Sequence, residues 1–270
     1  MSFKNSERIF ARTSCCNALI VATLLSCACG TARADDDGPT VTPYRPTISN
    51  PADLPVPGWL EGELGVLATH AEDRTRDDSV PWLLKFAFDE DHGVLVGGNA
   101  YVRSAAAGMP AQNGVGDTSI EWKQRFSVSA NAAFGIEAGV VLPTAEHGLG
   151  IGKPESLVNG IFSADVGAWH VDLNLARAHF AAHPLGASAW QTAWAAAVSA
   201  PLGTDWGAAF ELSGTYQRGI ATQSQALFAL NYNASHRVVL DAGVAYGLAH
   251  DAHDRSLFAG ATLLLGKLRD

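Results

Sequence analysis

The sequence contains no cysteine beyond residue 29, and all four of its cysteines lie near the N-terminus. The same stretch has the parts of a secretory signal: a basic start, an apolar run over residues 18–25, and Ala32-Arg33-Ala34 before Asp35 as a cleavage site. We therefore predict a signal peptide at residues 1–34 that is cleaved on export. The chain that remains would have no disulfides and no thiolate metal site, which suits passage through an oxidising periplasm.

Two alternatives for this segment remain open. It could stay attached as a membrane anchor, but its apolar run falls short of the ~20 residues that a helical span needs. It could also be a lipoprotein signal, because Leu24-Leu25-Ser26 before Cys27 loosely resembles a lipidation box. We expect cleavage after Ala34 in preference to either.

The sequence also lacks an excess of basic residues, with 18 Lys and Arg against 27 Asp and Glu and a formal charge of −9. The predicted signal carries four basic residues and one acidic residue, so its removal would leave a charge of −12. An acidic chain is repelled by the phosphate backbone of nucleic acids. We therefore expect no nucleic-acid partner, and no pattern in the sequence calls for a cofactor.

Long apolar runs are absent after the signal, and alternating segments take their place. In residues 117–125, Thr118, Ile120 and Trp122 share one face and charged residues share the other. Such a period of two indicates a strand between two different environments. About twelve segments follow this pattern: residues 58–68, 80–88, 94–103, 117–125, 134–142, 157–163, 169–178, 190–200, 206–216, 224–232, 238–246 and 258–266.

Two features predict that the apolar faces meet lipid. Long connections alternate with short ones along the chain, as in outer-membrane barrels with long outer loops and short periplasmic turns. Six of the seven tryptophans also fall on the apolar faces, mostly near strand ends, where membrane interfaces favour them. These residues are Trp82, Trp122, Trp169, Trp190, Trp194 and Trp206.

We therefore predict an all-β protein, a transmembrane antiparallel up-and-down β-barrel of about 12 strands over residues 58–270. A soluble β-sandwich with buried tryptophans is the alternative. Before the barrel, residues 35–57 hold six of the 12 prolines. Proline has no amide donor for a β-ladder, so this segment is expected to be extended. We interpret it as a periplasmic lead, and the alternative is that it folds into the barrel and narrows it.

The predicted lumen face carries many ionisable residues, which must be paired or surrounded by water. Folding residues 117–142 about their turn predicts Glu121 roughly opposite Glu137, with Lys123 bridging the two carboxylates. Lys85 or Arg103 would add to this cluster from the preceding strands. The cluster would act as a brace and a constriction, whether the lumen is open or plugged.

Several short motifs resemble a family of Gram-negative outer-membrane β-barrels labelled as phenol-degradation meta-pathway proteins and often called transporters. The motifs are Gly116-Asp117-Thr118, Glu121-Trp122-Lys123, Leu142-Pro143-Thr144, Tyr44-Arg45-Pro46-Thr47, residues 58–65 and residues 240–247. The resemblance implies an outer-membrane location and a passive channel for small, hydrophobic or aromatic molecules. The implied partners are outer-membrane lipid, a small-molecule solute and the barrel-assembly machinery.

Two other classes of function stay open. One is a structural or sensory barrel without transport. The other is a membrane-embedded hydrolase, which needs a serine, a histidine and an acid or amide at one wall. His170 is predicted to face inward near Asp172 and Asn174, but no serine has a fitting context. We therefore predict no catalytic residues.

Three further patterns are interpreted as surface loops. Residues 148–153 suggest a phosphate loop, but Pro154 stands where a Ser or Thr and a helix would be needed. The pairs His179 with His183 and His250 with His253 could bind a metal only with a third ligand, which the sequence does not show. We therefore predict no metal site.

Overall fold

The structure, a computed structural model, describes residues 38–71, 73, 75–146, 148–150, 152–249 and 254–269. The predicted signal peptide therefore lies outside the described residues. Among the residues that are described, no helix is long and apolar enough to cross a membrane. The strands are β1 Trp59–His70, β2 Arg76–Ala87, β3 His92–Ala105, β4 Gln112–Gly114, β5 Thr118–Ser129, β6 Ala132–Leu142, β7 Glu155–Val166, β8 Trp169–Phe180, β9 Trp190–Pro201, β10 Trp206–Gln217, β11 Gln223–Ser235, β12 Val238–Gly247 and β13 Arg255–Lys267.

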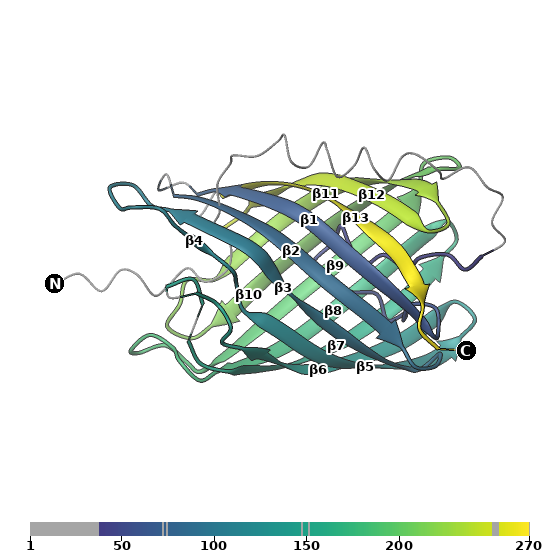
Figure 1. The fold of residues 1–270 in the computed structure, drawn as a ribbon, viewed down its shortest axis with the longest axis horizontal. Helices are drawn as coiled ribbons and strands as arrows, with labels where there is room; N and C mark the ends of the chain where they lie inside the picture. The colour runs from purple at the N-terminus through teal and green to yellow at the C-terminus, as the bar shows by residue number, and fades with distance from the viewer. Residues whose placement is uncertain are drawn as a thin grey trace.

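Twelve of these strands close into an antiparallel barrel, which Figure 1 shows from the side. Each strand pairs with its neighbours in the chain, and β1 closes the ring by pairing with β13. The three-residue β4 is an addition that pairs only with the outer end of β3. The predicted all-β up-and-down barrel of about 12 strands is therefore confirmed.

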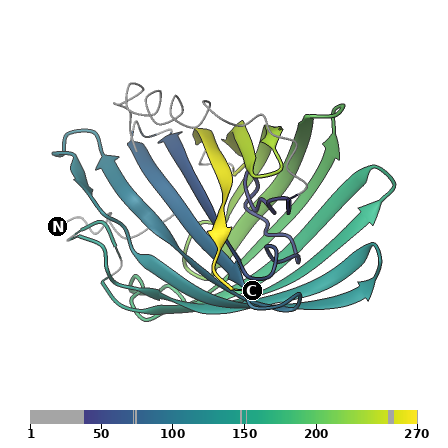
Figure 2. The ribbon, with the colours of Figure 1, turned by 45° about the vertical axis from the view of Figure 1, so that its right-hand side comes forward.

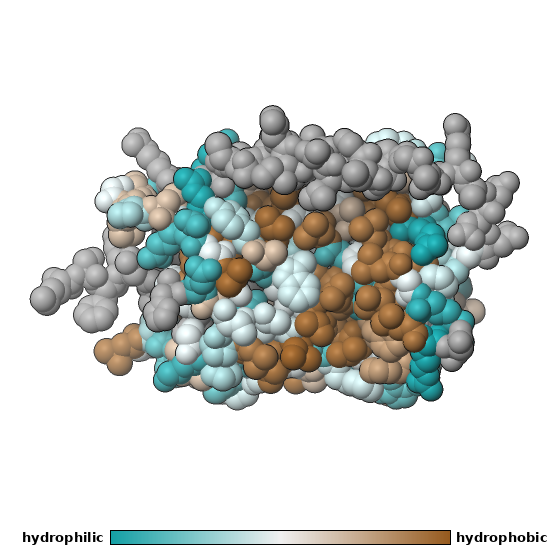
Figure 3. Space-filling view, viewed as in Figure 1, coloured by the Kyte–Doolittle hydropathy of each residue, from teal (hydrophilic) through white to brown (hydrophobic). Residues whose placement is uncertain are grey.

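Side chains alternate between the outside and the inside of the barrel. Along β10, Phe210 and Leu212 are exposed, whereas Ala209, Glu211 and Ser213 between them are buried. Hydrophobic residues cover the middle of the surface seen in Figure 3, and hydrophilic residues gather towards its two ends. This apolar belt is the surface that a bilayer covers, because every backbone polar group of a closed barrel is already paired within the wall.

The connections differ in length at the two ends. At one end they are short, and they span residues 88–91, 130–131, 167–168, 202–205 and 236–237. At the other end, the connections over residues 106–117, which include β4, 143–154 and 181–189 are longer, whereas residues 218–222 are a short connection. The first connection on this side covers only residues 71–75, because β1 and β2 extend further than their apolar pattern predicts. The short-turn end is the periplasmic end in barrels of this kind.

A bulge in β3 changes the face of one predicted lumen residue. The pairing of β2 with β3 shifts between Val80 and Pro81, so Ala100 is an extra residue without a partner. An extra residue reverses the alternation of every side chain beyond it. Arg103 therefore lies opposite Asp78 on the outer face of the wall, and its predicted place on the lumen face is wrong.

The pairing of β5 with β6 also differs from the predicted one. A register shift just after Ser127, at the connecting turn, places Lys123 directly opposite Glu137. Glu121 lies opposite Gly139, not opposite Glu137. Because the difference amounts to two residues, each side chain keeps its predicted face. The lumen location of these residues was therefore predictable, and their partners were not.

Residues 38–57, which we call the strap, lie inside the barrel. Figure 2 shows this purple segment within the ring of strands. Its residues contact side chains of β1, β6, β8, β10 and β12 from the inner side. Residues 35–57 are predicted to be a periplasmic lead, but the described residues of that segment lie within the barrel, which is the alternative arrangement. The physical reason is that the wall offers partners for backbone groups that a proline-rich chain cannot pair with itself.

Candidate functional site

The strap begins with two anchors on β1. The backbone N–H of Thr42 donates to both carboxylate oxygens of Glu61, at 3.1 and 3.2 Å. The backbone N–H of Tyr44 donates to Glu63 at 2.7 Å. Lys85 of β2 lies between the two carboxylates, 3.1 Å from Glu61 and 2.7 Å from Glu63, and it also donates to the carbonyl of Thr42. These buried charges are thus compensated by one another and by the strap backbone.

Tyr44 stands at the centre of the site, and two lysines contact its ring. The ammonium nitrogens of Lys85 and Lys123 lie 4.1 and 4.0 Å from the ring centroid. Both lysines are fully buried, and contact with an aromatic face stabilises a desolvated cation. The Tyr44 hydroxyl donates to the carbonyl of Asp53 at 2.7 Å. This bond joins the part of the strap before its turn at residues 48–49 to the part after it.

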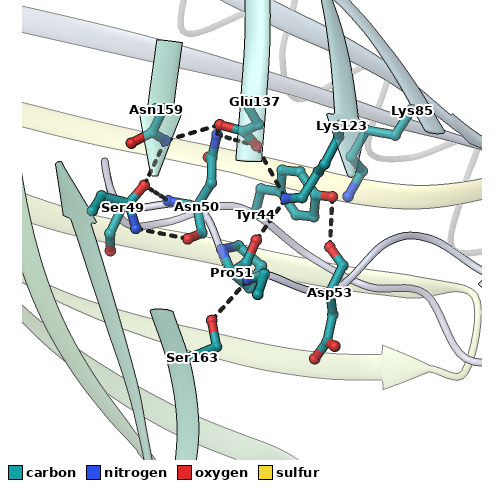
Figure 4. Close-up of polar contacts among 12 residues, drawn as sticks. Tyr44, Ser49, Asn50, Pro51, Asp53, Lys85, Lys123, Glu137, Asn159 and Ser163 are labelled. Carbon is teal, nitrogen blue, oxygen red and sulfur yellow. Dashed lines mark hydrogen bonds and ion pairs between the residues drawn. The ribbon is translucent and has the colours of Figure 1, made fainter. Parts of the chain in front are cut away.

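Glu137 of β6 is a second junction between strap and wall, drawn in Figure 4. Its carboxylate accepts from Lys123 at 3.0 Å, from the Asn50 amide at 3.0 and 3.1 Å, and from Asn159 of β7 at 2.9 Å. Lys123 donates further to the carbonyl of Pro51 at 2.5 Å. The cation therefore links a wall carboxylate to the strap and does not bridge two wall carboxylates.

Arg45 ties the strap to the opposite side of the ring. Its guanidinium donates two hydrogen bonds, each 2.9 Å long, to Asp241 of β12. It lies against Gly65 and Gly260, where an added Cβ would come within 2.5 Å of a guanidinium nitrogen. The close approach of the arginine to the wall thus requires glycine at both positions.

Glu211 of β10 holds the turn of the strap. One of its oxygens, Oε2, accepts from the backbone N–H of Ile48, the backbone N–H of Ser49 and the Ser49 hydroxyl, at 2.9, 2.8 and 2.9 Å. Glu211 is fully buried. Among the described residues, the ion pairs of the strap and the lumen join other carboxylates and none joins Glu211.

After its turn, the strap runs back along the inner side of β7, β5 and β3. The backbone N–H of Ala52 donates to the Ser163 hydroxyl at 2.7 Å, and Arg125 donates to Asp53 at 2.8 Å. Leu54 lies against Gly93, where a Cβ would come 2.6 Å from its methyl carbon. The strap therefore enters and leaves on the short-turn side and turns back within the lumen.

The strap narrows the half of the lumen nearest the short turns without filling the whole cross-section. Its wall partners Glu61, Asp241, Glu137 and Glu211 lie within the first six residues of their strands, counted from that end. Ile48 lies inside the barrel at the turn of the strap, yet it is 57% exposed. Solvent-accessible space therefore remains beside the strap, and the lumen is constricted there.

Of the five residues predicted to form a lumen charge cluster, the structure brings three together. Lys85, Lys123 and Glu137 meet around Tyr44 and the strap. Glu121 lies two residues before Lys123 on β5, over Gly139. A Cβ added at Gly139 would come 2.4 Å from the Glu121 side chain. Tyr44 was not predicted as a site residue, although its motif is one of those that resemble a family, because the partners of the strap lie far away in the chain.

The predicted interface tryptophans differ in their distance from the strand ends. Trp169 and Trp206 are the first residues of β8 and β10 at the short-turn end, and Trp190 is the first residue of β9 at the other end. Trp122 and Trp194 are also exposed, further along their strands, whereas Trp82 is half-buried. An interface location for the three terminal tryptophans agrees with the aromatic girdles of outer-membrane barrels.

The residues considered for hydrolysis do not form a nucleophile and base pair. The Ser163 hydroxyl donates to Asp172 and accepts from the strap, so both hydrogen bonds serve to hold the strap and the wall together. His170 contacts two carboxylates, Asp165 at 2.7 Å and Asp172 at 3.2 Å. A serine nucleophile needs its hydroxyl within hydrogen-bond reach of the base, and Ser163 is bonded to the acid.

The histidine pairs considered for metal binding show no metal site in the described residues. Within the described part of the chain, no group of three His, Cys, Asp or Glu residues could hold a metal ion. His179 was predicted in a loop but is the second-last residue of β8, with its ring centroid 4.8 Å from that of Trp190, while the exposed His183 follows in the loop. His250 and His253 lie outside the described residues.

The fold and the lumen define a class: a 12-stranded β-barrel of the outer-membrane type with an N-terminal segment inside. No family model matches the sequence, and no curated protein matches it. Solved structures do. The COG4313 outer membrane channel from Pseudomonas putida F1 is similar with a TM-score of 0.62 and 13% identity, covering 83% of this chain and 100% of that one.

Two porins share the same architecture at lower similarity. The NanC porin has a TM-score of 0.56 and 10% identity, and the match covers 75% of this chain and 100% of that one. The KdgM porin in complex with disordered oligogalacturonate has a TM-score of 0.50 and 10% identity, with 76% and 99% covered. At such low identity the likeness is one of fold.

Proposed function

We propose that the protein is a passive channel of the outer membrane for small solutes, narrowed by its own strap. The observation that carries the proposal is the solvent-accessible space that remains beside the strap at Ile48, within a lumen lined by polar and charged side chains. A barrel of 12 strands lies between the small barrels filled by side chains and the wide porins. The fold shared with a channel and two porins supports the same function.

The charge of the lumen favours neutral or cationic solutes over anions. Among the buried charged side chains of the described residues, seven are acidic and two are basic. The acidic residues are Glu61, Glu63, Asp77, Glu137, Asp172, Glu211 and Asp241, and the basic ones are Lys85 and Lys123. A lumen with an excess of one charge raises the local concentration of solutes of the opposite charge and repels those of its own. Acidic sugars, such as the ligand in the KdgM structure, are therefore poor candidates.

The sequence motifs that resemble the phenol-degradation barrels narrow the solute class further. Together with the acidic lumen they favour small uncharged aromatic molecules over their carboxylates. The protein would reach the membrane through the barrel-assembly machinery after cleavage of the signal peptide. No residue of the site supplies a nucleophile with its base, so passage without chemical change is the function that the geometry supports.

The experiment that tests the proposal is swelling of liposomes that contain the purified protein. The part of the swelling rate that depends on the protein, after subtraction of the rate in protein-free liposomes, should be larger in benzyl alcohol than in benzoate, which has a similar size and a negative charge. Planar bilayers would measure the conductance of the same preparation. A parent protein and a strap-loosened variant (Gly260→Ala) that both lack any conductance would show that the barrel is structural, which is the competing function.

A further inference from the structure

Glu211 differs from the other carboxylates that hold the strap. Glu61 and Glu63 are paired with Lys85, Glu137 is paired with Lys123, and Asp241 is paired with Arg45; the ion pairs of the described residues give Glu211 no such cation. A buried carboxylate without a cation depends on hydrogen bonds to remain charged. For Glu211 these bonds come from the strap alone.

The strap presents three donors to one oxygen of this carboxylate. Two backbone N–H groups, of Ile48 and Ser49, and the hydroxyl of Ser49 converge on Oε2 at 2.8 to 2.9 Å. The second oxygen, Oε1, is buried and has no hydrogen-bond partner. A primary ammonium group could replace the strap at this carboxylate, because one of its three N–H bonds can reach the oxygen and its positive charge adds the cation that Glu211 lacks.

The walls around Glu211 would suit the carbon skeleton of such a ligand. Its partners across the neighbouring strands are Ala197 of β9 and Leu227 of β11, both buried and apolar. Ser213, two residues further along β10, has a buried hydroxyl without a hydrogen-bond partner. A carboxylate beside small apolar walls and a free hydroxyl forms a site for an amphipathic cation once the strap has moved aside.

We propose that Glu211 is a binding site for small primary ammonium solutes, which the turn of the strap occupies as an internal ligand. An ammonium adds a charge-assisted hydrogen bond that the neutral strap donors do not provide. It binds only the state in which residues 48–49 have left Glu211, so it shifts the population towards the open lumen. The inference deepens the proposed function, on which it rests, by naming a solute class that opens its own passage.

The test uses the full protein with a single cysteine at a buried strap position, Ala52→Cys, and a charged methanethiosulfonate reagent. Residue 52 is buried against Ala133 and Ile161, so its modification reports release of the strap. Benzylammonium should accelerate modification by about tenfold at saturation, the factor that corresponds to one charge-assisted hydrogen bond. Benzyl alcohol, with the same ring and no charge, should leave the rate unchanged.

Two further variants identify the group responsible. In Glu211→Gln the strap keeps an oxygen acceptor but the ammonium loses its counter-charge, so benzylammonium should no longer accelerate modification. Glu155→Gln removes another lumen carboxylate, on β7 opposite Val141, and should respond like the parent. A second reporter, Leu54→Cys, repeats the measurement if Ala52→Cys does not fold. Equal acceleration by benzyl alcohol, or an undiminished response in Glu211→Gln, would overturn the proposal.

The same preparation separates this inference from the proposed function. If planar bilayers show no conductance while benzylammonium still releases the strap, the channel proposal fails and the binding site stands. If the parent conducts but benzylammonium does not change the modification rate, the channel stands and the ammonium site is refuted. The reagent reaches residue 52 from detergent solution, so the second measurement does not depend on transport.

Discussion

Asp241 on β12 receives the guanidinium of Arg45 through two parallel hydrogen bonds of 2.9 Å, and the wall there is made of glycine. A bidentate pair of this kind fixes orientation as well as distance. The arginine can lie flat against β1 and β13 only because Gly65 and Gly260 lack a Cβ. The position of the strap is therefore encoded on the barrel wall as much as in the strap itself.

Gly260→Ala should release Arg45 and widen the constriction. The new methyl group would come 2.5 Å from the guanidinium, so the side chain must move away from Asp241. A hydrogen bond to a charged group contributes about 1.5–3 kcal/mol. Loss of this pair should raise the mean single-channel conductance in planar bilayers. Gly266→Ala on the same strand is the control, because nothing lies within 4 Å of its Cβ position; equal conductance of the two variants would count against the strap as the constriction.

Lys123→Met should destabilise the barrel and its strap together. Glu137 would remain buried without the cation, and removal of one partner from a buried ion pair costs about 3–5 kcal/mol. The temperature at which the folded band disappears on a heat-modification gel should fall, and conductance should become more cation-selective. Lys153→Met, on an exposed loop residue, is the matched control.

The double variant Lys123→Met with Glu137→Gln isolates the charge from the packing. Because both charges are then absent, most of the lost stability should return. If Lys123→Met melts like Lys153→Met, or if the double variant is no better than the single one, Lys123 contributes nothing through Glu137. The same comparison also separates the ion pair from the contact of Lys123 with Tyr44, which both variants lose.

The barrel was predictable because a period of two is a local property. The outward direction of Phe210 and Ile136 can be predicted from the alternation of apolar and polar residues next to them, and both side chains are exposed in the structure. The inward location of Lys85, Lys123 and Glu137 followed from the same rule. The partner of a residue on the next strand cannot be predicted from the local pattern alone. Glu137 lies opposite Lys123 only because the register shifts at the turn after Ser127.

Two features could not be derived from the sequence by this rule. The bulge at Ala100 reverses the faces beyond it, and nothing in the alternation near Arg103 signals an extra residue. The strap has no period at all, because its backbone donors go to side chains such as Glu211, over 160 residues away. The prolines of the strap predict that it cannot pair as a strand, but they do not predict where it lies.

The turn between β2 and β3 should weaken at acidic pH. The backbone N–H of Asp91 and then the His92 side chain hydrogen-bond the carboxylate of Asp89 and lower its pKa below the usual value. A lowered pKa in the folded state means stability that is present above the unfolded value of about 3.9 and is lost as pH falls through the folded one. Protection of the Asp91 and His92 amides against hydrogen exchange should therefore decrease at low pH. In Asp89→Asn this pH dependence should vanish, and its persistence would assign the effect to another group.

Phe210→Arg should be far more harmful than Thr215→Arg on the same strand. Phe210 is 44% exposed in the apolar belt near the middle of β10, whereas Thr215 belongs to the inward-facing set with Glu211 and Ser213. An arginine that faces lipid costs about 2–4 kcal/mol near the midplane, and one that faces a polar lumen keeps its hydration. Urea unfolding in lipid vesicles, followed by the gel mobility of the folded form, measures both variants. Equal loss of stability in the two would mean that Phe210 does not meet lipid, and the assignment of the outer face would have to be abandoned.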